Sequence, residues 1–254
     1  MSSARSMRIF SHARGEGLDD LPKLPASELA AGTPQQYGRT YFNAPKLGLS
    51  VGMWSSSAFE GKMKALDADE FGLLLDGSAS ITEAGGKVTD LAAGDGFVIP
   101  RGVECGWKQA GHVRKIFITY ASPKAPSKSA PGNSTGAHVV KVETGARLSP
   151  CAGPDKSLLN GPEPRCTEHV AYTDASGQFT VGLWSATPYD RKATPFGRYE
   201  LMHFVEGHVD LHDGGQDSQG FGIGETVFVP KGAPLGWRSH RDVKKIFVIL
   251  TSEG

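Results

Sequence analysis

The chain contains a long internal repeat. Shifted by 130 positions, residues 48–120 align with residues 178–250 without a gap. The stretch "PRGVECGWKQ" (100–109) then matches "PKGAPLGWRS" (230–239), and "VRKIFIT" (113–119) matches "VKKIFVI" (243–249). A repeat unit of this length has the size of a domain and not of a small solenoid unit. The repeat therefore predicts two domains with the same fold.

The segment between the two copies has the composition of a linker. Residues 121–136, "ASPKAPSKSAPGNSTG", are rich in Pro, Ser and Gly, which is typical of an exposed connection. We expect an N-terminal domain at 1–124, a linker at 125–136 and a C-terminal domain at 137–254.

Within each copy the pattern indicates short β-strands. In the first copy "LSVGMW", "EFGLLL", "SASIT", "GFVIP" and "RKIFITY" are separated by Gly, Pro, Asp or Asn, the punctuation expected between strands. Only "SELAA" (27–31) and "KSLLN" (156–160) suggest a helical turn each. The chain is predicted to be all-β, with a barrel or sandwich in each copy.

Composition excludes several classes of protein. Lys and Arg together number 27, as do Asp and Glu, so the formal net charge is zero, and no basic stripe points to a nucleic-acid partner. No apolar run has the length of a membrane span. Three cysteines are too few for a disulfide framework. We expect a cytoplasmic protein with no membrane or nucleic-acid partner; the sequence leaves open whether it forms a homodimer.

Two spacings recur in both copies. Glu-x6-Gly is followed by Gly-x5-Pro-x-Gly, first from Glu70 to Gly102 and again from Glu200 to Gly232. These spacings resemble the two sequence motifs of the cupins, and the ending Pro-x-Gly-x-x-Cys-x-Trp in the first copy resembles the ethanolamine-utilisation-type cupins. The resemblance implies two tandem cupin-type jelly-roll β-barrels, a bicupin.

The resemblance also implies where a metal would bind. A metal-bearing cupin has His-x-His shortly before the Glu and a third His after Pro-x-Gly. Residues 60–69 and 190–199, which precede the two glutamates, contain no histidine, and the third position holds Cys105 or Leu235. A Glu with one thiol is too small a ligand set for a stable site. We therefore expect neither a metal nor another cofactor.

Five residues are candidates for a ligand-binding site. Glu70 and Glu200 are the candidate acid/base groups, with pKa values that rise if the side chains enter an apolar barrel, or they are structural carboxylates. Cys105 is a candidate ligand contact, although its alignment with Leu235 favours an inert buried thiol. Trp107 and Trp237 either line a pocket or pack in the core.

A histidine-containing strand offers another possible metal site. In "HVDLH" (208–212), His208, Asp210 and His212 alternate with two apolar residues. Because the apolar residues should face the barrel, we expect the three polar residues to form a solvated outer face.

These observations predict a degenerate bicupin that binds a small polar metabolite, a carboxylate, amine or sugar, inside a β-barrel. The N-terminal barrel is favoured, because Glu70 and Cys105 make its interior more polar than Glu200 and Leu235 make the other. An alternative is a metal-independent epimerase, isomerase or lyase that uses the barrel Glu as acid or base. A metal-dependent aminohydrolase or dioxygenase is less favoured.

Loss of the histidines can be tested directly. The purified, tag-free protein should contain far less than a stoichiometric amount of transition metal by elemental analysis, because each lost ligand weakens binding severely. Chelator treatment should leave its melting temperature unchanged. A stoichiometric metal that survives dialysis and disappears in Glu70→Gln or Cys105→Ser would contradict the expectation that the barrels bind no metal.

Overall fold

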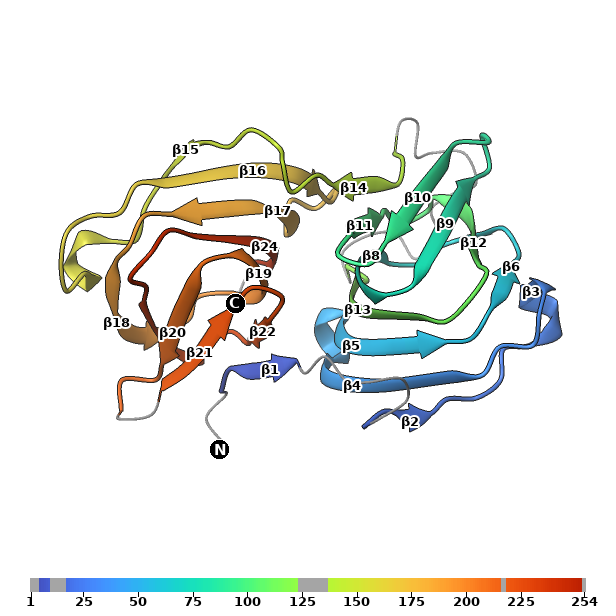
Figure 1. Cartoon of the computed structure of the whole chain (residues 1–254), viewed down its shortest axis with the longest axis horizontal. Helices are drawn as coiled ribbons and strands as arrows, with labels where there is room; N and C mark the ends of the chain where they lie inside the picture. Colours follow the sequence, from blue (N-terminus) through green and yellow to red (C-terminus); the bar gives the residue numbers. More distant parts are fainter. Residues whose placement is uncertain (1–4, 10–16, 123–136, 216–217, 253–254) are drawn as a thin grey trace. The chain divides into compact units, whose positions relative to one another are not determined.

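The computed structural model describes residues 5–9, 17–122, 137–215 and 218–252, and the chain divides into two compact units. One unit comprises Ser11–Glu143 and the other Met1–Phe10 with Thr144–Gly254. Both are built from antiparallel strands (Figure 1). No helix in the described part of the chain is long and apolar enough to cross a membrane.

The N-terminal unit consists of two sheets. The larger sheet has the strand order β14-β11-β8-β13-β5-β4-β2, and the smaller has the order β10-β9-β12-β6-β3, with β7 paired to β12. The elements are β2 (Asp19–Asp20), η1 (Ala26–Glu28), β3 (Leu29–Ala31), β4 (Gln36–Ala44), η2 (Pro45–Leu47), β5 (Leu49–Ser56), β6 (Phe59–Gly61), β7 (Lys64–Ala65), β8 (Asp69–Asp76), β9 (Ser78–Glu83), β10 (Val88–Ala92), β11 (Gly96–Ile99), β12 (Glu104–Gln109), β13 (Val113–Tyr120) and β14 (Val140–Val142).

The C-terminal unit has the same plan. Its sheets have the orders β1-β22-β19-β24-β17-β16-β15 and β18-β23-β20-β21. The elements are β1 (Met7–Ile9), β15 (Ser149–Cys151), η3 (Lys156–Leu158), β16 (Cys166–Thr173), β17 (Phe179–Ala186), β18 (Asp190–Pro195), β19 (Tyr199–Glu206), β20 (His208–His212), β21 (Ser218–Gly222), β22 (Thr226–Val229), β23 (Pro234–Arg238) and β24 (Val243–Leu250).

The sequence repeat is also a structural repeat. Strands β5, β8, β11 and β13 correspond to β17, β19, β22 and β24 at the same offset of 130 residues, and the order β11-β8-β13-β5 in one sheet matches β22-β19-β24-β17 in the other. The predicted strands and the predicted all-β class are confirmed. The turn predicted at 156–160 is the 3-10 helix η3, whereas the one predicted at 27–31 is helical only at its start, in η1, and continues as the strand β3.

Each unit takes one edge strand from outside the predicted domain limits. β1 pairs with β22 of the C-terminal unit, and β14 pairs with β11 of the N-terminal unit (Figure 1). Because β11 and β22 are equivalent strands, β14 and β1 complete the same edge in the two units. The compact units therefore differ from the expected limits of 1–124 and 137–254 at both short strands, while the expected linker at 125–136 lies outside the described residues.

The motif glycines adopt backbone conformations that other residues avoid. Gly77 and Gly207, which end the first motif in each copy, have φ values of 83° and 80°. A Cβ atom at these positions would lie 2.1 Å from the carbonyl oxygen of His112 and 2.2 Å from that of Asp242. The Glu-x6-Gly spacing thus contains a turn that requires glycine in both units.

The core of each unit lies between its two sheets. In the C-terminal unit Phe204 of β19 and Val227 of β22 pack in one cluster with Val209 and Leu211 of β20 in the facing sheet. The equivalent cluster of the N-terminal unit contains Ile81 of β9. Each unit is therefore a closed sandwich with a single interior, the architecture of a jelly-roll barrel.

The edge contact of β1 can be tested at Arg8. Its guanidinium pairs with Glu225, donates to the carbonyl of Gly220 and lies 4.1 Å from the centre of the Phe221 ring. Arg8→Ala should lower the free energy of unfolding of the C-terminal unit by about 1 kcal/mol in denaturant titration, the sum expected for a partly exposed ion pair and a cation–π contact. Arg5→Ala, at an exposed position, is the control; equal effects of both changes would show that β1 is not anchored through Arg8.

A second prediction concerns His203 on β19. The ring is buried, its Nδ1 lies 2.8 Å from Oγ1 of Thr226, and burial lowers its pKa from 6.5 to about 4. Between pH 6.5 and 4 the His203 ring is protonated in the unfolded chain but stays neutral in the folded chain. Protonation therefore favours the unfolded chain, and the free energy of unfolding should fall as the pH drops from 6.5 towards 4. His203→Gln should make that decline shallower, while His208→Gln, at an exposed ring, should not. The same pH dependence in all three proteins would contradict the assignment.

Candidate functional site

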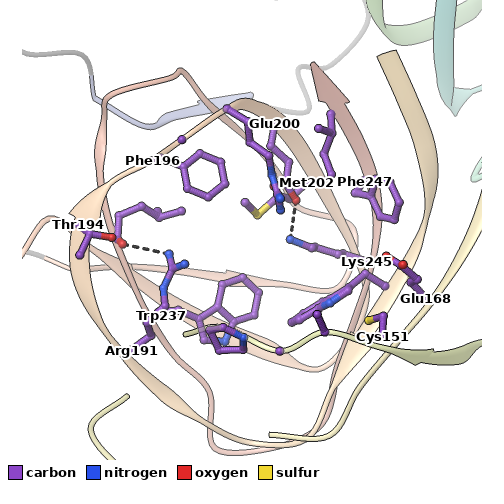
Figure 2. A pocket seen from close by; sticks show the side chains of 18 of the residues that line it. Cys151, Glu168, Arg191, Thr194, Phe196, Glu200, Met202, Trp237, Lys245 and Phe247 are labelled. Carbon is purple, nitrogen blue, oxygen red and sulfur yellow. Dashed lines mark hydrogen bonds and ion pairs between the residues drawn. The ribbon is translucent and has the colours of Figure 1, made fainter. Parts of the chain in front are cut away.

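Glu200 and Lys245 form a buried ion pair inside the C-terminal barrel. The two residues lie on the neighbouring strands β19 and β24, and Lys245 Nζ donates to Glu200 Oε1 over 2.7 Å. The exposed fractions are 1% for Glu200 and 5% for Lys245. Figure 2 shows the pair at the wall of a pocket. The candidate Glu200 therefore points into the barrel, where it has a charged partner.

A second cation contacts the same carboxylate. Arg198 Nε donates to Glu200 Oε2 over 2.8 Å. Burial alone would raise the pKa of Glu200, but Lys245 and Arg198 outweigh burial and hold the pKa of this carboxyl below its usual range. The expected rise in the pKa of Glu200 is therefore wrong, because the barrel interior supplies two positive charges beside it.

Aromatic rings surround the ammonium group. Lys245 Nζ lies 4.8 Å from the ring centre of Trp184 and 5.3 Å from that of Trp237, and the Tyr189 ring stacks on Trp237. Burial lowers the pKa of Lys245, whereas Glu200 opposes this change. Cation–π contacts and the carboxylate together compensate the ammonium for its lost water.

The ion pair opens onto a cavity of about 570 Å³ (Figure 2). Its apolar wall includes Phe196, Met202 and Leu235, and Trp237 also lines it. Its charged wall consists of Glu168, Arg191, Arg198, Glu200 and Lys245. An apolar cavity with a few converging charged groups is the usual form of a small-molecule site.

Arg191 is the cation of this wall that Glu200 does not engage. One of its terminal nitrogens donates to the backbone carbonyl of Leu235 over 3.1 Å. Its Nε is buried and makes no hydrogen bond with any described residue. A buried donor without a partner is costly in a native protein, so the Arg191 guanidinium is incompletely satisfied where it lies.

The N-terminal barrel contains the equivalent ion pair in different surroundings. Glu70 pairs with Lys115, whose Nζ lies 4.9 Å from the ring centre of Trp107 and 5.4 Å from that of Trp54. Cys105 is buried nearby, and burial, with Glu70 next in effect, raises the pKa of its thiol to about 11. A protonated thiol is a poor nucleophile, which favours the inert interpretation of Cys105.

The two barrels differ most at their cationic positions. At the repeat offset, Arg191 aligns with Gly61 and Arg198 aligns with Ala68, so the N-terminal barrel lacks both arginines. Glu70 and Cys105 favoured the N-terminal barrel as the binding site, whereas the cavity with this charged wall lies in the C-terminal barrel. Two sequence signals were available and missed: the lysine repeated as Lys115 and Lys245, and the two arginines present in one copy alone.

The histidine-containing strand β20 has the predicted alternation. Val209 and Leu211 are buried, His208 is exposed, and Asp210 and His212 are half-buried. His208 and Asp210 contact each other, at 3.3 Å between Nε2 and Oδ1. Across the described ranges, no three His, Cys, Asp or Glu side chains are grouped so that they could hold a metal ion. The expectation that this protein uses no metal stays a prediction.

One cluster in the N-terminal unit has the form of a catalytic triad. Ser55 Oγ lies 2.7 Å from His112 Nε2, and His112 Nδ1 lies 3.2 Å from Asp76 Oδ2. Ser55, however, has an exposed fraction of 0%. A substrate carbonyl cannot reach a fully buried hydroxyl, so we interpret the cluster as a structural hydrogen-bond chain between β5 and the start of β13.

Solved structures of similar fold cover nearly the whole chain. A protein of unknown function from Pseudomonas syringae pv. tomato has a TM-score of 0.75 at 24% identity, covering 97% of this chain and 99% of that one. A cupin 2 conserved barrel domain protein from Leptotrichia buccalis has a TM-score of 0.60 at 11% identity, with 88% and 98% covered. Protein Ylba from E. coli has a TM-score of 0.55 at 9% identity, with 100% and 94% covered. These likenesses show the fold.

The family assignment comes from the sequence. Among curated proteins, a search finds no match to this chain. The family model of the EutQ-like cupin domain matches residues 45–117 and again residues 173–247, which together make more than half of the chain. Both matches contain the glutamate, the glycines and the lysine described above. The chain belongs to the EutQ-like cupin family and carries two such domains.

Proposed function

We propose that the C-terminal barrel binds a small metabolite that carries a carboxylate group, and that Arg191 is the main contact for this group. The observation that carries the proposal is the Arg191 guanidinium, which lies in the cavity wall and has no carboxylate partner among the described residues. A carboxylate accepts hydrogen bonds from a guanidinium in a planar, two-point arrangement.

The charge of the cavity favours an anion over the other two ligand classes. Three cations, Arg191, Arg198 and Lys245, line the cavity with two acidic residues, Glu168 and Glu200. Three positive and two negative side chains leave the wall with a net charge of +1; Glu200 engages Lys245 and Arg198, and Arg191 has no carboxylate partner among the described residues. This charge would repel an amine, and it would gain little from a neutral sugar.

The size and the apolar wall limit the ligand further. A cavity of about 570 Å³ lies within the range of roughly 300–1,000 Å³ that small-molecule sites occupy. Phe196, Leu235 and Trp237 form a wall suited to a short carbon skeleton. The favoured ligand is therefore a small organic acid with an apolar portion.

An enzymatic role for Glu200 is the weaker alternative. Two cations hold its pKa below the usual range, so it is a carboxylate at neutral pH. A strongly stabilised carboxylate is a weak general base and cannot act as a general acid at that pH. An isomerase or lyase reaction would need Glu200 to act as an acid or base, whereas binding without turnover needs no such group. We therefore favour binding.

A panel of small carboxylic acids tests the proposal. We expect at least one member to raise the melting temperature of the full-length protein, and calorimetry should give a measurable dissociation constant. Arg191→Gln should weaken binding of that acid by roughly 10- to 100-fold, the value of a charged hydrogen bond. The matched amide and amine of the acid should not bind.

A neighbouring residue provides the control. Lys192 follows Arg191 on β18, is exposed, and donates to the carbonyl of Ser157. Lys192→Gln should leave the affinity unchanged. Equal losses in the two variants, or tighter binding of the matched amine than of the acid, would overturn the proposal.

A further inference from the structure

Two cysteines face each other across neighbouring strands of the C-terminal unit. Cys151 on β15 is the direct antiparallel partner of Cys166 on β16. Residues that pair in this way have Cα atoms about 4.5–5.5 Å apart and side chains on the same face of the sheet. A disulfide bond spans Cα atoms about 4.4–6.8 Å apart, so the two positions are compatible with one.

The packing places both thiols on the inner side of the sheet. Cys166 belongs to the core cluster between the two sheets, and Cys151 packs against that cluster. Both thiols are free, with Cys166 buried and Cys151 half-buried. A pocket of about 490 Å³ is lined by both cysteines together with Glu163, Arg165 and Asp242. A small oxidant can therefore approach the pair from that side.

We propose that Cys151 and Cys166 form a reversible disulfide bond when the protein meets a disulfide-bearing oxidant of the glutathione class. The more exposed Cys151 reacts first. Its thiolate attacks one sulfur of the oxidant, a mixed disulfide forms, and one glutathione thiolate leaves. The thiolate of Cys166 then attacks the Cys151 sulfur, releasing the second glutathione thiolate. Two protein thiols have lost two electrons and two protons, and the oxidant has become two reduced molecules.

The position of the bond gives it a consequence for the cavity. Residues 151–154 line the 570 Å³ cavity, so Cys151 is part of the cavity wall (Figure 2). β15 is the edge strand of its sheet and pairs only with β16 among the described strands. A bond to Cys166 would fix this edge strand, and with it one wall of the cavity. The bond itself does not depend on the proposed ligand, and the test below uses none.

Counting free thiols in the native full-length protein tests the proposal. The reduced chain has three cysteines. After incubation with oxidised glutathione and alkylation under denaturing conditions, we expect one alkylated residue, Cys105, and one internal disulfide. Peptide mapping should recover the Cys151–Cys166 cross-link, and dithiothreitol should restore three free thiols. The reaction should be faster at pH 9 than at pH 7, because burial raises the pKa of both thiols.

Single variants separate the steps. In Cys166→Ser the reaction should stop at a stable glutathione adduct on Cys151, while Cys105→Ser should cross-link like the parent protein. A stable Cys151 adduct in the parent, equal consumption of Cys105, or cross-linking between chains would overturn the proposal. Far-ultraviolet circular dichroism of each variant before oxidation confirms that the result refers to folded protein.

Discussion

The interaction on which the two barrels depend is a glutamate–lysine pair placed where neither residue could be buried alone. Moving an isolated carboxylate or ammonium group from water into a protein interior costs several kcal/mol. Glu200 and Lys245 meet that cost together, at 2.7 Å from each other, with Trp rings covering the remaining faces of the ammonium. Because removal of either partner would leave a buried charge, the pair constrains β19 and β24 jointly. Glu70 and Lys115 form the corresponding pair on β8 and β13, where the side chains keep exposed fractions of 19% and 12%.

The same pair stands in two different electrostatic environments. In the N-terminal barrel, Trp54 and Trp107 lie around Lys115, and Cys105 adds a neutral thiol. In the C-terminal barrel, Arg198 and Arg191 add two positive charges that the acidic residues of the wall do not fully balance. The difference in charge between the two barrels therefore lies outside the shared pair, at two positions where the N-terminal copy has Gly61 and Ala68.

Much of the fold was predictable because its signals are local. The strands and the turn glycines follow from spacings of a few residues, repeated twice. The edge strands β1 and β14 were not predictable, because three-residue strands have no distinctive pattern and pair with residues far away in the sequence. The site was predicted only in part. Glu200 and Trp237 line the cavity, but the importance of Lys245 and Arg191 depends on which side chains converge in space.

The lysine also explains how the glutamates can remain where the histidines of a metal-bearing cupin are missing. A carboxylate that retained its buried position without a cation would be destabilising, and the lysine on the neighbouring strand supplies that cation from the chain itself. In the C-terminal barrel both oxygens of Glu200 are already engaged, Oε1 by Lys245 and Oε2 by Arg198. A ligand entering the cavity would therefore meet Glu200 with both oxygens engaged and, in Arg191, a guanidinium without a carboxylate partner among the described residues. The recognition of an anion that we propose for this cavity is electrostatic, and it rests on this difference between the engaged carboxylate and the arginine.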